Sequence, residues 1–423
     1  MNATMDAAAV ARLREERLDW RFRQVPAGGT LAEAAAARPN LFRDGFLGPF
    51  VVLDQQALEH NLTTMADWSA RQGLALAPHG KTTMAPALFQ RQLDLGAWAI
   101  TVAHAGQARV CRAFGVSRVL VANEFTDPGG LAWLAAELAD PGFEFLCFAD
   151  SVEAVRLMAD GLAEAPRPVD VLVEIGMAGG RTGARDLATA TTVAEAVAAT
   201  PALRLAGVAG YEGPAASTAD VDGLAAVWSY LDTLRTAAVS LHRLVETDRT
   251  IVSAGGSSYF DVVAASLTGS WPMDVLPVLR SGAYVTHDDG FYRDLSPLGA
   301  TPRLAGVPRL RAALTGWAQV ASVPEPGLAL LAAGKRDLPY DLGMPVARLH
   351  RTGNAVAPVS GFEVPTMNDQ HTYLRFPEDQ AVAVGDWIGL GLSHPCTSFD
   401  KWPLLPVTAP DGETVVDFVR TFF

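Results

Sequence analysis

Lys81 stands in the turn Pro78-His79-Gly80-Lys81-Thr82, directly after a short apolar run. If that run is a barrel strand, the lysine lies at the mouth of an apolar barrel, where partial loss of water lowers the pKa of its amine. The neutral amine is the form that a Schiff base requires. Gly80 lets the backbone approach a ligand closely, and Pro78 fixes the turn. The turn therefore predicts a Schiff-base lysine, although an isolated lysine after a strand is usually a solvated loop residue.

A glycine-rich segment, Ser253-Ala254-Gly255-Gly256-Ser257-Ser258, follows another apolar run. Its backbone N–H groups are not obstructed by Cβ atoms at the two glycines, an arrangement that can cradle a phosphate. A tight turn would explain the glycines as well. A position after the seventh barrel strand favours the phosphate, because barrel phosphate sites frequently use the loops after strands seven and eight.

Arg181 and Tyr211 follow two further apolar runs. A guanidinium group in a glycine-flanked loop can point a fixed donor at a ring nitrogen or a carboxylate, but a surface arginine paired with an acidic neighbour would have the same sequence. Tyr211 has an apolar ring and a polar tip, which suit ring contact or proton transfer, although core packing explains many such tyrosines. Both residues are candidates for contact with a ligand.

His394 and Cys396 form a His-Pro-Cys segment near the C-terminus. Imidazole and thiolate groups two residues apart on an extended chain point the same way, so both can bind one divalent ion, with Zn²⁺ the natural choice. A hydrogen-bonded histidine beside an inert buried cysteine is the alternative. Asn368 and His371, in the cluster Asn368-Asp369-Gln370-His371, are candidates for hydrogen bonds to the ligands of that ion.

These side chains need a scaffold, and short apolar runs from residue 74 onward alternate with longer segments of helical period. The predicted strands are Leu74–Pro78, Trp98–Ala103, Arg118–Ala122, Phe143–Phe148, Val169–Ile175, Leu203–Val208, Thr250–Ser253 and Val278–Tyr284. Repeated strand–helix units over about 210 residues predict an α/β fold with a closed (β/α)8 TIM barrel, and an open doubly wound sheet is the alternative. Loops after barrel strands meet on one face, so several of the candidate residues that follow these strands should line one pocket.

After Asp288 the composition shifts to frequent Gly and Pro with short apolar runs, which predicts a C-terminal all-β domain. The predicted organisation is a helical segment at residues 1–45, a barrel at 56–290, and a β domain formed by 46–55 and 291–423 that carries the metal pair. The run Phe50–Leu53 is expected to pair with that β domain. The stretch Met5–Phe22 predicts an amphipathic helix that serves packing or dimer formation.

Composition excludes several classes of partner. Lys and Arg total 33 against 46 Asp and Glu in 423 residues, a net charge of −13, so nucleic acid and anionic membranes are not expected to bind. The first 22 residues contain no continuous apolar run, which predicts neither a signal peptide nor a membrane span. Three cysteines are too few for a disulfide framework and fit a reducing, cytoplasmic location. Cys111 and Cys147 are expected to be packing residues.

Together, the Pro-His-x-Lys-Thr turn, the Arg-x-Gly loop, the Gly-Gly-Ser loop, the Asn-x-x-His segment and the His-Pro-Cys segment resemble the fold-type III pyridoxal-phosphate enzymes, within them the D-serine dehydratase and D-threonine aldolase branch. The resemblance covers residues 45–400 and implies a homodimer with a D-amino acid substrate. Its implied catalytic residues are Lys81 and Tyr211, and its implied cofactor contacts are His79, Lys81, Arg181, Tyr211, Ser253, Gly255, Gly256, Ser257 and Tyr284. Arg181 or Tyr211 would face the pyridine nitrogen. His394 and Cys396 would bind zinc or another divalent metal.

The resemblance implies β-elimination from a D-3-hydroxy amino acid, in which Lys81 removes the Cα proton and the metal polarises the β-hydroxyl group, to give a 2-oxo acid and ammonia. The His-x-Cys pair resembles the dehydratases, whereas Thr82-Thr83-Met84 follows the lysine where the eukaryotic-type D-serine dehydratases tend to have a His-Lys pair. Retro-aldol cleavage of the D-threonine aldolase type is one alternative. A D-threo-3-hydroxyaspartate dehydratase is another and would need a further cation, for which Arg109, Arg181 and Arg185 are candidates. A non-catalytic carrier of pyridoxal phosphate, which needs no metal, is the alternative from another class.

Overall fold

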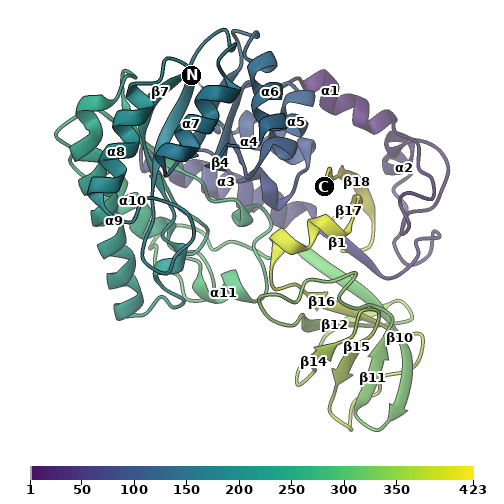
Figure 1. Ribbon diagram of the computed structural model, residues 1–423. Helices are drawn as coiled ribbons and strands as arrows, with labels where there is room; N and C mark the ends of the chain where they lie inside the picture. Colours follow the sequence, from purple (N-terminus) through teal and green to yellow (C-terminus); the bar gives the residue numbers. More distant parts are fainter. Residues whose placement is uncertain (1) are drawn as a thin grey trace.

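The computed structural model describes residues 2–423, which form a barrel, a β domain and an N-terminal segment that contacts both (Figure 1). The barrel strands form a parallel eight-stranded sheet in the order β2-β9-β8-β7-β6-β5-β4-β3. A backbone bridge between His79 and Thr101, and a hydrogen bond of 2.7 Å from the Trp98 N–H to the Leu76 carbonyl, join the two ends of this order. The sheet therefore curls round on itself, which confirms the predicted barrel and excludes the open doubly wound sheet.

All eight predicted barrel strands are present, and a helix separates each strand from the next. The strands are β2 (Ala75–Leu76), β3 (Ile100–Val102), β4 (Arg118–Glu124), β5 (Glu144–Ala149), β6 (Val169–Ile175), β7 (Leu203–Gly210), β8 (Thr250–Ala254) and β9 (Val275–Leu279). The helices are α4 (Pro86–Asp94), α5 (Ala105–Ala113), α6 (Pro128–Glu137), α7 (Val152–Gly161), α8 (Leu187–Ala198), α9 (Val221–Leu241) and α10 (Phe260–Leu267). Short 3₁₀ turns η2 (Gly80–Thr82), η3 (Gly213–Ala215) and η4 (His242–Leu244) lie between them.

The barrel strands are apolar on both faces because side chains of each strand alternate between the barrel interior and the surrounding helices. Leu120, Leu146 and Leu172 belong to the inner cluster, whereas Val119 and Val121 belong to the large cluster that includes the helices. The inner cluster also contains small residues, Ala77, Ala99, Ala206 and Ala209. Because this interior is packed, the candidate polar side chains can meet at the strand ends.

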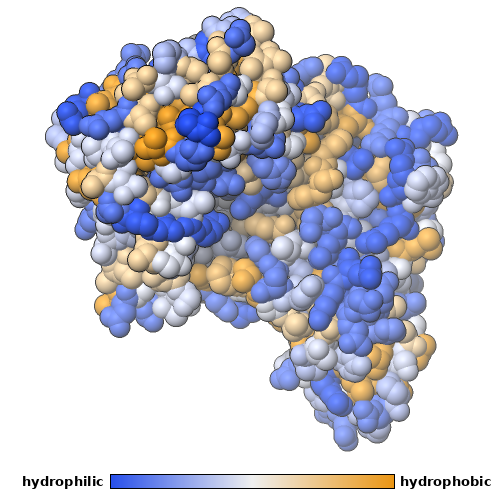
Figure 2. All heavy atoms as spheres, in the orientation of Figure 1, coloured by the Kyte–Doolittle hydropathy of each residue, from blue (hydrophilic) through white to orange (hydrophobic). Residues whose placement is uncertain are grey.

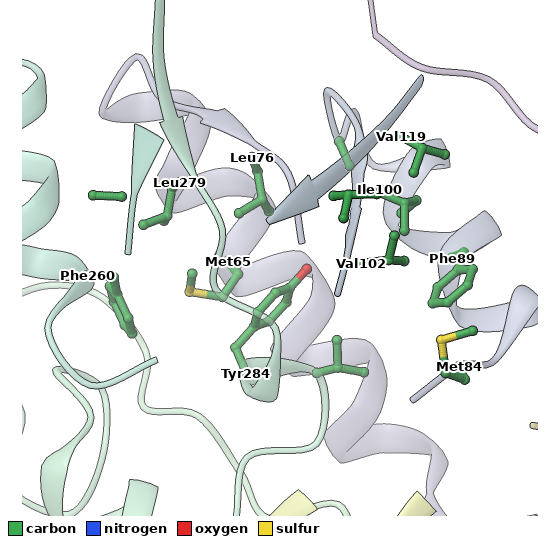
Figure 3. Close-up of a cluster of buried hydrophobic side chains, with 14 of the residues drawn as sticks. Met65, Leu76, Met84, Phe89, Ile100, Val102, Val119, Phe260, Leu279 and Tyr284 are labelled. Atoms are coloured by element: carbon green, nitrogen blue, oxygen red, sulfur yellow. The ribbon is translucent and has the colours of Figure 1, made fainter. Parts of the chain in front are cut away.

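The last barrel strand was predicted at Val278–Tyr284 but lies at Val275–Leu279, and Ala283–Val285 forms the 3₁₀ turn η5. Pro277 obscures the true start because proline lacks the N–H group that a strand ladder uses. The shift places Tyr284 in the hydrophobic core rather than at a strand end, among Met65, Leu76 and Leu279 (Figure 3). Its hydroxyl accepts a hydrogen bond of 3.1 Å from Gln92 Nε2.

The β domain joins two distant parts of the chain. Its strands are β1 (Phe50–Asp54), β10 (Leu314–Glu325), β11 (Leu328–Leu331), β12 (Val346–Thr352), β13 (Ala355–Pro358), β14 (Glu363–Met367), β15 (Thr372–Arg375), β16 (Trp387–Gly391), β17 (Leu404–Thr408) and β18 (Val415–Arg420). As predicted, Phe50–Leu53 pairs with this domain: β1 runs antiparallel to β10 and parallel to β17. Helix α3 (Gln55–Arg71) then leads from β1 into the barrel, and α11 (Phe291–Leu295), η6 (Pro395–Thr397) and η7 (Phe399–Lys401) border the junction.

The predicted helix Met5–Phe22 is wrong beyond Glu15. The N-terminal segment contains α1 (Ala7–Arg12), the turn η1 (Leu13–Glu15) and α2 (Leu31–Ala37). Beyond η1 the chain extends, and Leu18 and Phe22 pack in a cluster with β18 and β17 side chains. Packing against the β domain therefore overrides the local helical pattern. Helix α1 contacts α4, so this segment contacts both parts of the molecule.

Residues 2–423 contain no helix that is long and apolar enough to cross a membrane. Hydrophilic side chains are spread over both the barrel and the protruding β domain on the face shown in Figure 2.

Candidate active site

A cavity of about 520 Å³ lies at the carboxyl ends of the barrel strands and reaches the β domain. It brings together nine of the predicted site residues: His79, Lys81, Arg181, Tyr211, Gly255, Gly256, Ser257, His394 and Cys396. Its other lining residues are Thr82, Ala103, Ala122, Asn123, Phe148, Glu174, Thr182, Arg280, Gly282, Ala283, Phe291, Tyr292 and Leu342. Ser253, Tyr284, Asn368 and His371 do not line it.

Lys81 lies in the turn η2, which follows the short strand β2. Gly80 is required there because an added Cβ would lie 2.8 Å from Phe89 Cε1 and 2.9 Å from Ile100 Cγ2. Burial lowers the pKa of the Lys81 amine, the nearby Cys396 thiol opposes that shift, and Arg181 and Arg280 add to it. The lysine therefore has the desolvated setting that its sequence context predicts.

His79 precedes Lys81 and carries an unpartnered atom. Its Nδ1 is buried and has no hydrogen-bond partner in residues 2–423. Burial, followed by the neighbouring charges of Lys81 and Arg280, lowers the pKa of His79 well below its ordinary value. The neutral imidazole is therefore favoured, and another part of His79 lines the cavity.

Arg181 and Tyr211 lie face to face. The Arg181 guanidinium stands over the Tyr211 ring, 4.6 Å from its centroid. Burial raises the pKa of Tyr211 to about 12. The Arg181 loop is fixed by Arg185, whose guanidinium donates to the carbonyls of Thr182 (2.8 Å), Gly183 (3.0 Å) and Gly180 (3.2 Å).

Of the three arginines considered for a second substrate carboxylate, only Arg181 lines the cavity. Arg185 is committed to the backbone of the loop. Arg109 is exposed on helix α5. Of these three arginines, only Arg181 could therefore bind a second carboxylate of the substrate.

The glycine-rich loop differs from its prediction. The N–H groups of Gly255 and Gly256 do not face the cavity, because the buried carboxylate of Glu212 accepts both, at 3.0 and 2.9 Å. The N–H groups of Ser257, Gly282 and Ala283, which line the cavity, have no backbone or side-chain acceptor in the described chain. A phosphate group in the cavity would therefore find its backbone donors at these three residues.

Arg280 was missed by the sequence analysis because the last strand was placed across it. It is buried at the end of β9, where it donates to Ser253 Oγ at 2.6 Å and to the Gly210 carbonyl at 2.5 Å. Ser253 thus holds Arg280 instead of touching the cavity. An arginine directly after the apolar run Val275–Leu279 is the signal that could have revealed this site residue. An arginine that is buried at such a place needs an anionic or polar partner.

His394 and Cys396 lie together at the β-domain side of the cavity. The Asp341 carboxylate binds His394 Nδ1 at 2.6 Å, which leaves Nε2 for another partner. Burial works to lower the pKa of His394, but the contacts with Cys396 and Asp341 outweigh it and raise the pKa to about 9. Thr82 Oγ1 lies 3.2 Å from Cys396 Sγ, so the Lys81 turn contacts this pair directly.

The donor set of His394 and Cys396 fits a borderline-soft divalent ion, because a metal-binding imidazole commonly has a carboxylate on its other nitrogen. Residues 2–423 hold no group of three or more His, Cys, Asp or Glu side chains arranged for a metal. Asn368 and His371 are exposed at the turn between β14 and β15 and do not line the cavity, and the residue that contacts His394 within the chain is Asp341. A carboxylate distant in sequence leaves no local motif that could have revealed it.

The other two cysteines are packing residues, as expected. Cys111 and Cys147 are fully buried, and burial raises the pKa of Cys111 to about 12. Cys396 is partly exposed toward the cavity.

Two neighbouring carboxyl groups lie near the carboxyl ends of their strands, Glu124 in β4 and Glu174 in β6, and Glu174 lines the cavity. Both Glu124 oxygens and Glu174 Oε2 are buried and unpartnered in the described chain. Burial, and then the neighbouring Glu174 carboxyl, raise the pKa of Glu124 to about 8. The folded protein therefore binds a proton here at pH values at which the unfolded chain has lost it.

We expect the Glu124 proton to make stability depend on pH. Because the pKa is higher in the folded state, its stabilising contribution is complete below pH 4.5 and is lost as pH rises to about 8. The free energy of unfolding of the wild type should fall relative to that of Glu124→Gln across this range, on the order of 2 kcal/mol after allowance for partial exposure. Guanidinium denaturation at a series of pH values measures the difference. The exposed Glu164 provides the control, Glu164→Gln, and parallel pH profiles for the wild type and Glu124→Gln would contradict the assignment.

Comparison with known proteins gives a consistent family. Residues 53–265, half of the chain, match the alanine racemase N-terminal domain, and residues 313–408 match a serine dehydratase domain. D-Threonine aldolase from an Arthrobacter species is 28% identical over 83% of this chain and 86% of its own length. D-Threonine aldolase from Filomicrobium marinum superposes with a TM-score of 0.76 at 26% identity, over 89% of this chain and 95% of that one.

D-threo-3-Hydroxyaspartate dehydratase from Delftia sp. HT23 shares the fold, with a TM-score of 0.69 at 22% identity over 89% of this chain and 98% of that one. A cysteine-to-alanine variant of a D-threo-3-hydroxyaspartate dehydratase has been solved in a metal-free form.

Proposed function

This chain belongs to the alanine racemase N-terminal domain family and is a pyridoxal-phosphate-dependent lyase of fold type III; on that premise we propose that it acts on D-3-hydroxy amino acids and removes the β-hydroxyl group. The observation that carries the proposal is the contact between the Lys81 turn and the His394–Cys396 pair, through Thr82 Oγ1 and Cys396 Sγ at 3.2 Å. Racemisation of an amino acid breaks no bond at Cβ, so a racemase needs no such pair.

The cavity residues fit pyridoxal phosphate. The proposed attachment point is Lys81 Nζ, the proposed phosphate donors are the N–H groups of Ser257, Gly282 and Ala283, and His79 lines the same cavity. Arg280 joins Arg181 and Tyr211 as a candidate partner of the pyridine ring, because its guanidinium is fixed at the cavity floor. The bound cofactor supplies an electron sink that makes the Cα proton of the substrate acidic.

Lys81 is the proposed base. Its pKa is lowered by burial, so a larger fraction of the amine is neutral and can accept the Cα proton at Nζ. Arg181 and Arg280 add positive charge that further disfavours the ammonium form and also attracts an anionic substrate.

His394 Nε2 and Cys396 Sγ are the proposed ligands of Zn²⁺ or another divalent ion, which supplies Lewis-acid polarisation of the β-hydroxyl group. Asp341 holds the imidazole in the orientation that presents Nε2, through its 2.6 Å contact with Nδ1. The metal-free form described for a cysteine variant of a similar dehydratase supports a thiolate ligand. A free thiol also supports the proposed reducing, cytoplasmic location.

Retro-aldol cleavage is the second candidate, and the similarity to D-threonine aldolase over most of both chains favours it. In this cleavage the β-hydroxyl group loses its proton while the Cα–Cβ bond breaks, and the His394–Cys396 pair would hold the metal that binds the β-oxygen, as in dehydration. The two reactions differ in products: a 2-oxo acid and ammonia from dehydration, glycine and an aldehyde from cleavage.

Incubation of the purified protein with D-serine, D-threonine and D-threo-3-hydroxyaspartate, with and without a chelator, tests the proposal. We expect ammonia and a 2-oxo acid from at least one D-substrate, none from the L-enantiomers, and loss of turnover when the chelator removes the metal. Glycine and an aldehyde would establish the aldolase. A metal-free protein that binds pyridoxal phosphate and turns over none of these substrates would establish the carrier instead.

A further inference from the structure

Glu212 lies directly behind the glycine-rich loop. It follows β7 and the turn residue Tyr211, and its side chain is completely buried. One carboxylate oxygen accepts the Gly255 N–H at 3.0 Å and the other accepts the Gly256 N–H at 2.9 Å. Gly255 and Gly256 line the cavity, whereas Glu212 does not. The Glu212 carboxylate therefore binds the glycine-rich loop on the side that faces away from the cavity.

The loop has little freedom to adopt another shape. Gly255 has φ +105°, a conformation open to glycine, and a Cβ on Gly256 would lie 2.8 Å from Tyr211 Cε2. Two consecutive N–H groups that point into the protein interior need acceptors, and Glu212 supplies both. Without that carboxylate, the loop would have to turn one or both N–H groups elsewhere, and Ser257 would move with them.

A buried carboxylate also needs compensation for its lost hydration. The Arg280 guanidinium is the nearby positive charge, and Arg280 itself is fixed by Ser253 Oγ and the Gly210 carbonyl. The carboxylate of Glu212 is bonded to Gly255 and Gly256, and the charge of Arg280 favours its ionised form. Arg280 lines the cavity but Glu212 does not, so Glu212 can hold the loop without touching a ligand.

We propose that Glu212 is the positioning residue of the phosphate subsite: by holding Gly255 and Gly256 from behind, it presents Ser257 toward Gly282 and Ala283, where the cofactor phosphate binds. The inference rests on the proposed binding of pyridoxal phosphate. It assigns the phosphate to donors other than the two glycine N–H groups, and it predicts that Glu212 acts on phosphate binding alone.

Glu212→Gln tests this role through binding rather than turnover. The amide has one acceptor oxygen in place of two, so one of the glycine N–H groups loses its partner. Cofactor is removed from the purified holoenzyme, and the dissociation constants of pyridoxal phosphate and of pyridoxal, which lacks the phosphate, are measured by absorbance. We expect the constant for pyridoxal phosphate to rise about tenfold in the variant, which corresponds to the loss of one such bond, while that for pyridoxal stays the same.

Glu246→Gln is the matched control. The Glu246 carboxylate accepts the Leu205 N–H at 2.9 Å near the opposite end of the same strand, β7. This variant also removes a carboxylate that holds backbone, but it lies away from the cavity. We expect its ratio of pyridoxal to pyridoxal-phosphate dissociation constants to equal that of the wild type.

Each outcome has one meaning. If the wild type binds pyridoxal phosphate and pyridoxal equally, the proposed phosphate subsite is wrong. If it binds neither compound, the proposed cofactor is wrong. If the wild type prefers pyridoxal phosphate and Glu212→Gln keeps the full preference, the positioning role fails and the proposed function stands. A parallel loss of both compounds would also overturn it, because it shows a general structural role. Inorganic phosphate provides a second measurement: it should strengthen pyridoxal binding in the wild type but not in Glu212→Gln.

Discussion

Replacement of Lys81 by alanine is expected to remove the cofactor absorbance at the edge of the visible range and to lower turnover by about 10³-fold or more. The reason is that the Lys81 side chain serves both as the proposed attachment point of the cofactor and as the proposed base, and no other lysine of residues 2–423 lines the cavity. The chain has only three lysines, Lys81, Lys335 and Lys401, and of these only Lys81 lines the cavity. Absorbance spectroscopy and the product assay measure the two losses.

The scarcity of lysine makes the control simple. Lys335→Ala and Lys401→Ala should keep the wild-type spectrum and turnover. Borohydride reduction of the holoenzyme fixes the cofactor to the lysine that holds it, and mass spectrometry should then find the added mass on the peptide with Lys81 alone. Label on either of the other lysines, or an unchanged spectrum in Lys81→Ala, would refute the assignment.

Replacement of His394 by alanine or of Cys396 by serine is expected to release the metal and to reduce turnover by about 10³-fold. The spectrum of the bound cofactor should stay close to that of the wild type, because Lys81 remains. Metal analysis of the purified variants, together with the product assay, measures both effects. A variant that loses the metal but retains the cofactor is still folded, because general unfolding would release both.

His371 supplies a matched control for the metal variants. It is exposed at a turn of the β domain and does not line the cavity, so His371→Ala should keep wild-type metal content and turnover. Full metal content in both His394→Ala and Cys396→Ser would show that the pair is not the metal site. Loss of metal with undiminished turnover would show that the metal is structural.

The barrel could be predicted from the sequence because each strand is an apolar run followed by a helical period, a signal carried by neighbouring residues. Lys81, Arg181 and Tyr211 were placed in one cavity by the rule that loops after barrel strands converge, whereas His394 and Cys396, in the β domain, were added by the family resemblance; all five line the cavity. What failed was local detail that depends on distant partners. Pro277 hid the start of the last strand, so Tyr284 was assigned to the site although it packs in the core.

Hydrogen-bond partners across the fold could not be predicted in the same way. Asp341 and His394 are 53 positions apart, and Glu212 and Gly255 are 43 apart, so no spacing rule connects them. Glu212 shows the physical point most clearly: free glycine N–H groups are a sound expectation for an isolated loop, but a carboxylate from the neighbouring strand end had already taken them. Buried polar groups are partnered by the whole fold, not by the segment that contains them.

The contact between Thr82 and Cys396 has a consequence for heating the protein. Thr82 belongs to the barrel and Cys396 to the β domain, and the chain between them is 314 positions long. Lys81 and the proposed metal ligands His394 and Cys396 can therefore reach one small substrate only while the barrel and the β domain stay in contact. A displacement of a few ångströms between the two parts would abolish turnover while both parts are still folded. On heating, turnover should therefore be lost before the circular dichroism signal. A bound substrate that contacts both parts should raise the temperature at which turnover is lost.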